Sequence, residues 1–542
     1  MIVPMTDSTG CTVTPRDLEA APQTMPRAPA LASAGHGVLA NSRVWAGLRE
    51  PPSASGAYRP GAREPWTPDR VGPRPSRMMT GRPPARRASN GIGQTPTMNE
   101  TRAPSEDGGL HPAARQHPSK LFVEVTTRCN LRCAMCPKYA SGSEISEGDL
   151  ALDAFARLEP ALPHLDALIL NGIGEPLLHR HLERFIEVGR QALPARGWVG
   201  FQTNGQLLHR DRARSLVNSG VDRVCISVDA VSPELFHSLR VGGKQEAVEN
   251  AASAIDAAAR ESHRDVWLGV EFVAMRENVR QLPDLVRWAA RNHVRFVIVT
   301  HMLAYGQGTT GAAFEPVTDL TLQAHRECKE RAAADGLDLP SDPACFLKPQ
   351  SANATATERR VMDFFWTAST RASSEGIWIR PDWLARGCDE SLARQVEVAF
   401  AEASEIAERE GIDLRLPAIV PRRVRRCDFV EDGSLFVSWN GDTHPCYFLW
   451  HRYRCHIGGL TKQVKPVSFG NLADADVLSL WGSAGARAFR DAVLRYDYSF
   501  CYDCIGALCD RHQEAEFTLD CLQSPVPCGG CLWATGVFQC LR

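Results

Sequence analysis

The chain has 542 residues, and its 61 lysines and arginines nearly balance 63 aspartates and glutamates, giving a formal net charge of −2. This length allows two or three domains with a sizeable core, and the balanced charge gives no bulk attraction to nucleic acid or to a membrane surface. No apolar run reaches the ~18 residues that span a bilayer, and no charged-then-apolar signal peptide is present. We therefore expect neither a nucleic-acid partner nor a membrane partner.

The cysteines are clustered rather than spread along the chain. Of the 18 cysteines, ten lie between residues 427 and 540 and three between residues 129 and 136. Disulfide frameworks belong mainly to small secreted domains, whereas clustered cysteines in a long chain indicate metal binding in a reducing compartment. We therefore expect a cytoplasmic protein.

Residues 1–115 differ in composition from the rest of the chain. They contain about half of the 36 prolines, together with many Arg, Ser, Gly and Ala residues and hardly any apolar periodicity. Such a segment cannot bury enough apolar surface to offset its ordering entropy, so we expect a disordered tail. A solvated tail and sequence upstream of a true start at Met98 are both compatible with this pattern.

The first predicted strand, Leu121–Val125, leads into the run Thr126-Thr-Arg-Cys-Asn-Leu-Arg-Cys-Ala-Met-Cys-Pro137. Thiolates of Cys129, Cys133 and Cys136 in C-x3-C-x2-C spacing can hold three corners of a four-iron cluster. The next cysteine, Cys225, lies far along the chain, so one iron would stay open to another ligand. A zinc knuckle is the alternative, but it needs a fourth protein ligand at comparable spacing.

This run resembles the cluster loop of radical S-adenosylmethionine (radical SAM) enzymes. In that family the open iron chelates the amino and carboxylate groups of SAM, and an electron from the cluster cleaves the sulfonium to give a 5′-deoxyadenosyl radical. The family often has an aromatic residue before the third cysteine, where this chain has Met135. Methionine is polarizable and can still cover a flat ring.

Short apolar strands then alternate with amphipathic helices, which predicts βαβ units and a parallel sheet. The predicted strands are Leu121–Val125, Ala167–Leu170, Val199–Gln202, Arg223–Val228, Val266–Val273 and Arg295–Val299, and the predicted helices are 151–160, 180–193, 206–219, 245–260 and 279–292. Six such units match the partial (β/α)6 barrel of radical SAM enzymes. We expect this α/β core to cover residues 119–304, with its catalytic loops at the carboxyl ends of the strands.

The second strand is followed by Asn171-Gly-Ile-Gly-Glu-Pro176, which resembles the Gly-Gly-Glu-Pro motif of the family with one residue inserted. The resemblance implies that Gly172, Gly174, Glu175 and Pro176 bind the SAM amino group. Glycines let backbone approach a ligand closely, and carbonyl or carboxylate oxygens accept hydrogen bonds from an ammonium. By itself the segment would be an ordinary turn between a strand and a helix.

Three further segments match SAM-binding positions of the family. Asn204 ends the third strand, Ser227 and Asp229 end the fourth, and Arg240 follows in Leu-Arg-Val-Gly-Gly243. The resemblance places the fourth-strand residues near the SAM ribose and carboxylate and pairs Arg240 with the carboxylate, a task that suits its bidentate fork. A helix cap for Asn204 and a surface salt bridge for Arg240 are the structural alternatives.

Residues 305–420 give fewer signals. Helices are predicted near 318–334 and 390–410, whereas 340–388 is irregular, so we interpret 305–420 as a helical linker or insertion. The sequence names no catalytic acid or base. His301 ends the sixth strand near the expected site, but a core or helix-capping histidine fits equally well.

The last part of the chain, residues 421–542, resembles a SPASM domain, which carries auxiliary four-iron clusters in radical SAM enzymes. The resemblance rests on a cysteine, a spaced Gly-x4-Cys and later C-x2-C groups, and its candidate ligands are Cys427, Cys446, Cys501, Cys504, Cys509, Cys521, Cys528, Cys531 and Cys540. Two clusters need about eight thiolates, so two are expected, and Cys455 is the best candidate for a spare. The pairs Cys501/Cys504 and Cys528/Cys531 also approach a zinc ribbon, which would leave five cysteines unexplained.

The C-terminal sequence is most similar to that of radical SAM/SPASM metalloenzyme maturases, which are linked to partners such as tungsten-containing aldehyde oxidoreductases. This resemblance implies modification of a peptide or protein substrate, with a ferredoxin or flavodoxin as electron donor. Ribosomal-peptide modification, sulfatase-type side-chain oxidation and a non-catalytic iron–sulfur scaffold are the alternatives. The SAM-binding segments argue against the scaffold, which needs no SAM pocket.

Overall fold

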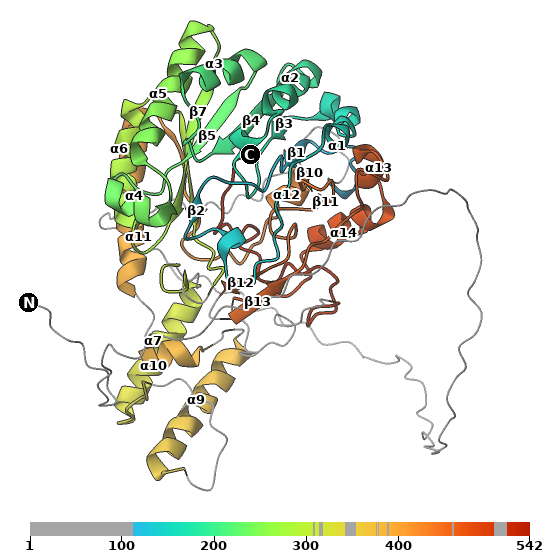
Figure 1. Cartoon of the computed structure of the whole chain (residues 1–542). Helices are drawn as coiled ribbons and strands as arrows, with labels where there is room; N and C mark the ends of the chain where they lie inside the picture. Colours follow the sequence, from blue (N-terminus) through green and yellow to red (C-terminus); the bar gives the residue numbers. More distant parts are fainter. Residues whose placement is uncertain are drawn as a thin grey trace, which may run out of the picture. The chain divides into compact units, whose positions relative to one another are not determined.

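A largely parallel sheet of nine strands organises the described part of the computed structural model (Figure 1). The structure describes residues 112–306, 309–313, 318–341, 354–375, 377, 379–386, 390–457, 460–502 and 518–541, which belong to one compact unit. Nearly all of the predicted tail 1–115 lies outside the described residues, as do Cys504 and Cys509.

The strand order in this sheet is β11-β10-β1-β3-β4-β5-β7-β8-β9, and β10 with β11 is its one antiparallel pair. Two small antiparallel sheets, β2 with β6 and β12 with β13, lie outside it. The strands are β1 (Lys120–Val123), β2 (Arg132–Cys133), β3 (Ala167–Ile169), β4 (Trp198–Thr203), β5 (Arg223–Ser227), β6 (Arg240–Val241), β7 (Trp267–Ala274), β8 (Phe296–His301), β9 (Asp413–Arg415), β10 (Ser434–Val437), β11 (Thr443–His444), β12 (Tyr453–Ile457) and β13 (Leu460–Val464).

Helices connect the parallel strands, and short 3₁₀ turns flank several of them. The helices are α1 (Leu152–Ala156), α2 (Leu182–Ala192), α3 (Arg210–Ser219), α4 (Pro233–Leu239), α5 (Gln245–Glu261), α6 (Leu282–Arg291), α7 (Asp319–Ala334), α9 (Ala356–Ser374), α10 (Pro381–Arg386), α11 (Glu390–Glu410), α12 (Asp428–Glu431), α13 (Val477–Trp481) and α14 (Ala484–Arg495). No helix among the described residues is long and apolar enough to cross a membrane.

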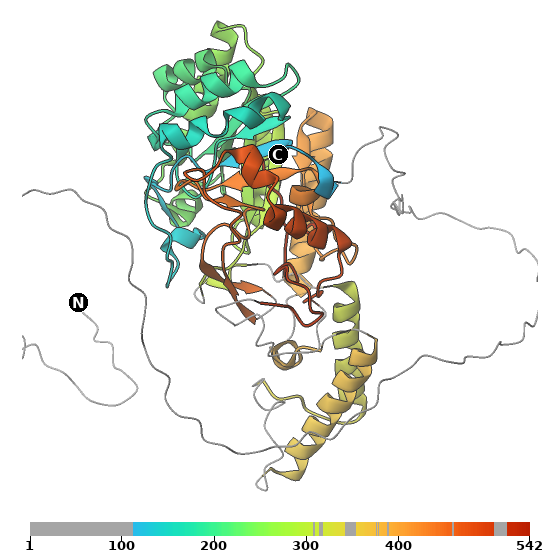
Figure 2. The ribbon, with the colours of Figure 1, turned by 90° about the vertical axis from the view of Figure 1, so that its right-hand side faces the viewer.

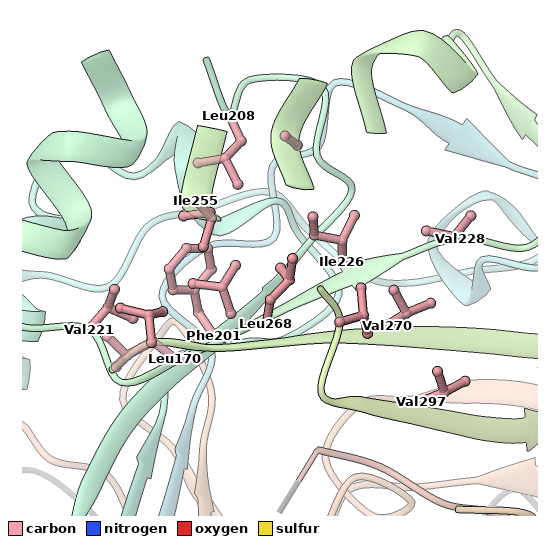
Figure 3. Packing of buried hydrophobic residues seen from close by; sticks show 14 of the residues in the cluster. Leu170, Phe201, Leu208, Val221, Ile226, Val228, Ile255, Leu268, Val270 and Val297 are labelled. Carbon is pink, nitrogen blue, oxygen red and sulfur yellow. The ribbon is translucent and has the colours of Figure 1, made fainter. Parts of the chain in front are cut away.

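The two faces of the sheet belong to two different cores, because successive side chains of a strand point to opposite faces. In β5, Val224 and Ile226 join the larger core, which packs against the barrel helices (Figure 3), whereas Cys225 between them faces the second core. The second core also contains buried residues of the cysteine-rich C-terminal part, such as Phe448 and Trp450. The inner face of the sheet is therefore covered by the C-terminal domain.

The predicted α/β barrel is confirmed, and each of the six predicted strands is present within about two residues of its expected bounds. The first predicted helix is shorter than expected. It spans Leu152–Ala156 and gives way to a 3₁₀ turn at Glu159–His164. Pro160 and Pro163 lack the N–H that an α-helix needs, which explains the early end.

The C-terminal domain is not a separate appendage, because its strand β10 pairs in parallel with β1. The register places Leu435 beside Leu121 and Phe436 beside Phe122, on the side of β1 that β3 leaves open (Figure 1). The sheet therefore extends past the six strands that local patterns predict. Such a pairing joins segments more than 300 residues apart, and local sequence patterns carry no signal for it.

The segment 305–420 differs from the expected linker, because its last part completes the barrel. Helix α11 packs against α6 through Val396, Phe400 and Ala403, all buried in the larger core, and β9 then pairs in parallel with β8 (Figure 2). The described helices of this segment before α11 pack separately from the barrel core. There α7, α9 and α10 share a small core of their own, including Cys328 and Phe365.

Candidate active site

The three cysteines of the first loop line one cavity of about 310 Å³ at the carboxyl ends of the parallel strands. Cys133 lies in β2, which pairs with β6 so that Cys133 stands beside Arg240. The thiols of Cys129 and Cys133 both act electrostatically on Cys136, so the three groups are close neighbours. The loop thus brings Cys129, Cys133 and Cys136 together, as the sequence predicts.

The donor set fits a four-iron cluster better than a single metal ion. Among the described residues, no three Cys, His, Asp or Glu side chains converge closely enough to hold one ion. A zinc ion requires all its sulfur ligands at about 2.3 Å from one point, whereas a four-iron cluster takes each thiolate on its own iron. Burial raises the pKa of all three thiols, that of Cys136 to about 11, so bound iron would be needed to hold them as thiolates.

The two glycines of Asn171-Gly-Ile-Gly-Glu-Pro176 serve close packing of the chain on itself. A Cβ on Gly172 would lie 2.4 Å from Glu124 Cγ, and one on Gly174 would lie 2.3 Å from the Thr126 carbonyl oxygen. The segment is also tied to the cysteine loop by a 2.7 Å hydrogen bond from Glu175 N–H to the Arg128 carbonyl. Both glycines line the cavity, so the segment shapes the site through its backbone.

Glu175 follows β3, and its side chain connects this segment to the end of β4 through hydrogen bonds. Its carboxylate accepts hydrogen bonds from Thr203 Oγ1 at 2.7 Å, from Asn204 N at 2.7 Å and from Leu177 N at 3.1 Å. The residue is buried and still lines the cavity, whereas Pro176 only begins the 3₁₀ turn behind it. Three protein donors already occupy Glu175, which leaves the neighbouring backbone as the freer acceptor for a ligand amine.

Asn204 reaches across to the first cysteine. Its Nδ2 donates to Asn130 Oδ1 at 2.8 Å and lies 3.8 Å from Cys129 Sγ. An amide donor at this position favours the thiolate form of a cysteine and lowers its pKa against the effect of burial. Asn204 therefore contacts the Cys129 thiol and also lines the cavity.

Arg240 and Asp229 form a buried ion pair at 2.7 Å, with Arg240 toward the cavity and Asp229 behind it. Asp229 Oδ1 also accepts from Val273 N at 2.9 Å, which fixes the carboxylate. Arg240 Nε has no hydrogen-bond partner among the described residues, so the guanidinium keeps a buried donor for a ligand carboxylate. Ser227 completes this side and accepts from Gln202 Nε2 at 3.1 Å.

Glu271 is a cavity residue that sequence reasoning missed. It lies on β7, and its carboxylate accepts a short hydrogen bond from Gln202 Nε2. Burial, and then the negative charge of Asp229, raise the pKa of Glu271 to about 7, although Arg240 and the Gln202 hydrogen bond act in the opposite direction. The available signal was strand periodicity, since this glutamate falls on the inward face of an otherwise apolar strand.

His301 lines the cavity but is held as a neutral structural group. Its Nε2 lies 3.2 Å from the Ala418 carbonyl oxygen, and its ring stacks on Phe400 at 5.9 Å. Burial lowers the pKa of His301 to about 4, so the ring is uncharged near neutral pH. The interpretation as a core histidine fits these contacts.

The C-terminal domain closes the cavity with a largely aromatic wall. Tyr447 donates a 2.5 Å hydrogen bond to Asn171 Oδ1, which ties the wall to the glycine segment. Gln539 N donates to Thr300 Oγ1 at 3.3 Å, which ties it to β8. The wall consists of Tyr447, Trp450, Trp533, Phe538, Gln539 and Cys540.

Four of the predicted auxiliary ligands form one buried group. Cys427, Cys446, Cys528 and Cys531 all belong to the second core, and the Cys528 thiol is influenced by the other three. Burial raises the pKa of these thiols, that of Cys446 to about 12. The structure thus groups Cys528 and Cys531 with Cys427 and Cys446. The zinc ribbon considered from the sequence would instead group them with Cys501 and Cys504.

The remaining C-terminal cysteines lie at different places. Cys540 influences Cys446 and also lines the cavity, whereas Cys501 is bonded through its N–H to Gly529 at 3.0 Å. Cys521 is exposed. Cys455 is fully buried, and the one charged group that acts on its thiol is Lys462, among the described residues. Cys504 and Cys509 lie outside the described residues, so their predicted role stays a prediction.

The chain combines a parallel α/β barrel, three thiols in the loop after the first strand, and a second buried cysteine group. This combination is typical of one class of iron–sulfur enzyme. The comparisons agree with this class. Residues 123–289 match the model of the radical SAM superfamily, and residues 427–505 match that of the SPASM iron-sulfur cluster-binding domain. The chain thus contains a radical SAM domain and a SPASM domain. It is an iron–sulfur enzyme, and its cofactors are [4Fe–4S] clusters and SAM.

Two curated relatives show the range of similar proteins. The chain is 26% identical over 426 residues, 78% of its own length and 96% of the relative, to the tungsten-containing aldehyde ferredoxin oxidoreductase cofactor-modifying protein of Pyrococcus furiosus. It is 35% identical over 120 residues to a probable GTP 3′,8-cyclase of Methanocella arvoryzae, which is 22% of this chain and 36% of that protein. Among solved structures, Streptococcus suis SuiB bound to S-adenosylmethionine is similar with a TM-score of 0.43 at 14% identity, over 75% of this chain and 77% of SuiB.

Proposed function

We propose that this enzyme cleaves SAM reductively to a 5′-deoxyadenosyl radical and modifies a peptide or protein, in the maturation of a metalloenzyme. The observation that carries the proposal is one cavity lined by three neighbouring thiols, the glycine segment and Arg240. The role in metalloenzyme maturation is supported by the relative that matches 78% of the chain and is named for modification of an oxidoreductase cofactor. An electron donor such as ferredoxin or flavodoxin is part of the proposal.

The residues of the chain would share the work as follows. Cys129, Cys133 and Cys136 would hold the cluster, which, once bound, supplies the electron and the open iron for SAM cleavage. Arg240, kept in place by Asp229, would bind the SAM carboxylate through its unpartnered donor. The backbone of the glycine segment that lines the cavity, Gly172–Glu175, would accept from the SAM amine, and Ser227 would contact the ribose. The aromatic wall from Tyr447 to Phe538 would exclude water from the radical.

The auxiliary ligands can be assigned in part. We place one auxiliary cluster on the buried group Cys427, Cys446, Cys528 and Cys531, with Cys540 as a neighbour on the cavity side. A second cluster would use Cys501, Cys521, Cys504 and Cys509. In domain terms, the radical SAM core spans residues 119–304, α11 and β9 complete it, and the SPASM domain spans 421–542.

The test is anaerobic reconstitution with iron and sulfide, followed by SAM and a strong reductant. The parent protein is expected to form 5′-deoxyadenosine, and Cys133→Ala is expected to reduce its formation by at least ~100-fold because one cluster corner is lost. Cys328→Ala is the matched control, since Cys328 is buried in the separate small core and is not among the residues that line the cavity of the three thiols. If the parent forms no 5′-deoxyadenosine, or if Cys133→Ala behaves like Cys328→Ala, the proposal is wrong.

A further inference from the structure

The fully buried carboxylate of Glu124 connects the end of the first strand to two distant parts of the chain. Glu124 directly follows β1. Its Oε1 accepts a hydrogen bond from Ile173 N at 3.1 Å, and its Oε2 accepts one from Trp439 N at 3.3 Å. His451 Nε2 lies 3.0 Å from the same Oε2. Ile173 belongs to the glycine segment, whereas Trp439 and His451 belong to the C-terminal domain, so one carboxylate joins the two.

The partners of Glu124 determine which atom donates in its contact with His451. An ionised carboxylate only accepts hydrogen bonds, and the two backbone N–H groups that face it only donate. The imidazole nitrogen beside it must therefore carry a hydrogen, so His451 Nε2 is a donor. Among the described residues, His451 is also the one basic side chain within ion-pair distance of this carboxylate. Loss of the donor would leave a buried acceptor only partly satisfied, which is costly enough to displace the side chain.

Glu124 supports the glycine segment from outside the cavity. It is not among the described residues that line the cavity, whereas Gly172, Ile173 and Gly174 are. The backbone at Gly172 lies directly on Glu124, since a Cβ there would be 2.4 Å from Glu124 Cγ. A shift of the carboxylate would therefore release the Ile173 N–H between the two glycines. It would also move the backbone acceptors to which the proposed function assigns the SAM amine.

Resting on the proposed function, we propose that Glu124 is a positioning residue for SAM, and that His451 of the C-terminal domain holds it in place. The C-terminal domain thus contributes to the affinity for SAM through the hydrogen-bonded connection from His451 to Glu124 and from Glu124 to Ile173. Neither Glu124 nor His451 is among the described cavity-lining residues, so neither touches the ligand. This contribution depends on a donated hydrogen bond and not on a cysteine.

The first test is SAM affinity, measured by anaerobic titration calorimetry on the full-length, reconstituted protein without reductant, so that SAM is bound but not cleaved. His451→Phe keeps a ring but removes the donor, and it is expected to raise the Kd for SAM at least ~5-fold. His451→Gln restores an amide N–H near the same position and should keep the Kd within about twofold of the parent. Iron and sulfide contents should equal those of the parent in both variants, because no cysteine is changed.

Lys120→Met is the matched control for the domain boundary. Lys120 Nζ pairs with Asp432 at 3.0 Å, so this contact also joins β1 to the C-terminal domain, but at the opposite end of the strand from Glu124. The variant keeps most of the aliphatic stem and removes the charge. Its Kd for SAM should stay within about twofold of the parent, because the glycine segment is not involved.

Hydrogen exchange supplies a second measurement that needs no variant. Binding of SAM and order in the glycine segment are linked, so bound SAM should slow exchange of the amides that depend on Glu124. In the parent protein, SAM is expected to slow exchange at Ile173 and at Trp439 by at least ~3-fold, as measured by mass spectrometry with fragmentation to single residues. Trp439 is informative because it is not among the described cavity-lining residues. Val493, buried in α14 of the same domain, is the internal reference and should be unchanged.

Three results would overturn the assignment while leaving the proposed function intact. The first is an unchanged Kd in His451→Phe at parent iron content. The second is equal weakening in His451→Gln or Lys120→Met, because SAM binding would then depend on packing at the domain boundary rather than on the donated hydrogen bond. The third is slower exchange at Ile173 without slower exchange at Trp439, which decides the question if His451→Phe does not fold. Failure of the parent protein to bind SAM counts instead against the proposed function.

Discussion

At the scale of single residues, Gly174 shows that a motif can be needed for packing and for chemistry at once. A Cβ there would meet two backbone carbonyls, at 2.3 Å from Thr126 O and at 2.6 Å from Arg128 O, and backbone cannot move aside as a side chain can. Arg128 directly precedes Cys129. Any shift that relieves the clash therefore moves the cysteine loop.

We expect Gly174→Ala to lower the free energy of unfolding by about 1–3 kcal/mol and to reduce 5′-deoxyadenosine formation. The matched control is Gly485→Ala, at an early position of α14 with nothing within 4 Å of its Cβ, where alanine should be neutral or stabilising. Denaturant unfolding and product assay measure the two effects. Equal stability and activity in both variants would show that the close approach at Gly174 is unimportant.

Two cysteines of the C-terminal domain have different expected roles although both are buried. Cys446 has Cys531 and Cys540 as electrostatic neighbours, whereas Lys462 is the group that acts on Cys455. A thiol that belongs to a cluster determines whether iron is retained. A thiol that only fills core space does not.

Cys446→Ala is therefore expected to lose about four irons and four sulfides per chain, from about twelve in the parent if three clusters form. Cys455→Ala should keep the parent content, with a modest loss of stability from the small cavity. Iron and sulfide analysis after anaerobic reconstitution gives the answer. Iron loss from Cys455→Ala with retention in Cys446→Ala would reverse the assignment.

At the scale of elements, α11 is part of the barrel although it lies in a segment that resembles a linker. Phe400 is 5% exposed and stacks on His301 at 5.9 Å, whereas Val398, two residues before it, is 65% exposed. Substitutions at these two positions of one helix can therefore distinguish how burial and helix propensity each contribute to the free energy of unfolding.

Phe400→Ala is expected to cost about 3–5 kcal/mol of unfolding free energy, because it removes a buried aromatic ring and leaves a cavity. Val398→Ala should stay within about 0.5 kcal/mol. Urea unfolding followed by circular dichroism measures both variants. If Phe400→Ala is as stable as Val398→Ala, α11 does not stabilise the barrel and is better described as a linker.

The sequence predicts those features that depend on local order. Strands such as Arg223–Ser227 follow from a short apolar run, and the cysteine loop follows from spacing within eight residues. The partnership of Cys446 with Cys531 joins residues 85 positions apart, and nothing in either local pattern selects the partner. Glu271 lies outside the positions that match the family motifs, so the resemblance does not predict this carboxylate.

At the scale of the whole molecule, the pairing of β10 with β1 joins the barrel and the C-terminal domain in one continuous sheet. Trp481 Nε1 donates to Arg115 O at 2.8 Å, and His451 Nε2 lies 3.0 Å from Glu124 Oε2, so further contacts cross the same boundary. A sheet strand with partners on both sides cannot be released without breaking both ladders. The auxiliary cluster would thereby be held at a fixed place relative to the cavity.

This arrangement predicts that β1 and β10 open together. Phe436 of β10 is fully buried beside Phe122 of β1, so Phe436→Ala should destabilise the protein by about 3–5 kcal/mol. Hydrogen exchange measured by mass spectrometry should then show equal loss of protection in the peptides that contain β1 and β10, because one cooperative unit has a single opening free energy. Val424→Ala, at a position 87% exposed, is the control and should leave both peptides unchanged. Loss of protection confined to β10, with β1 protected as in the parent, would mean that the cysteine domain folds independently and that its cluster can move relative to the barrel.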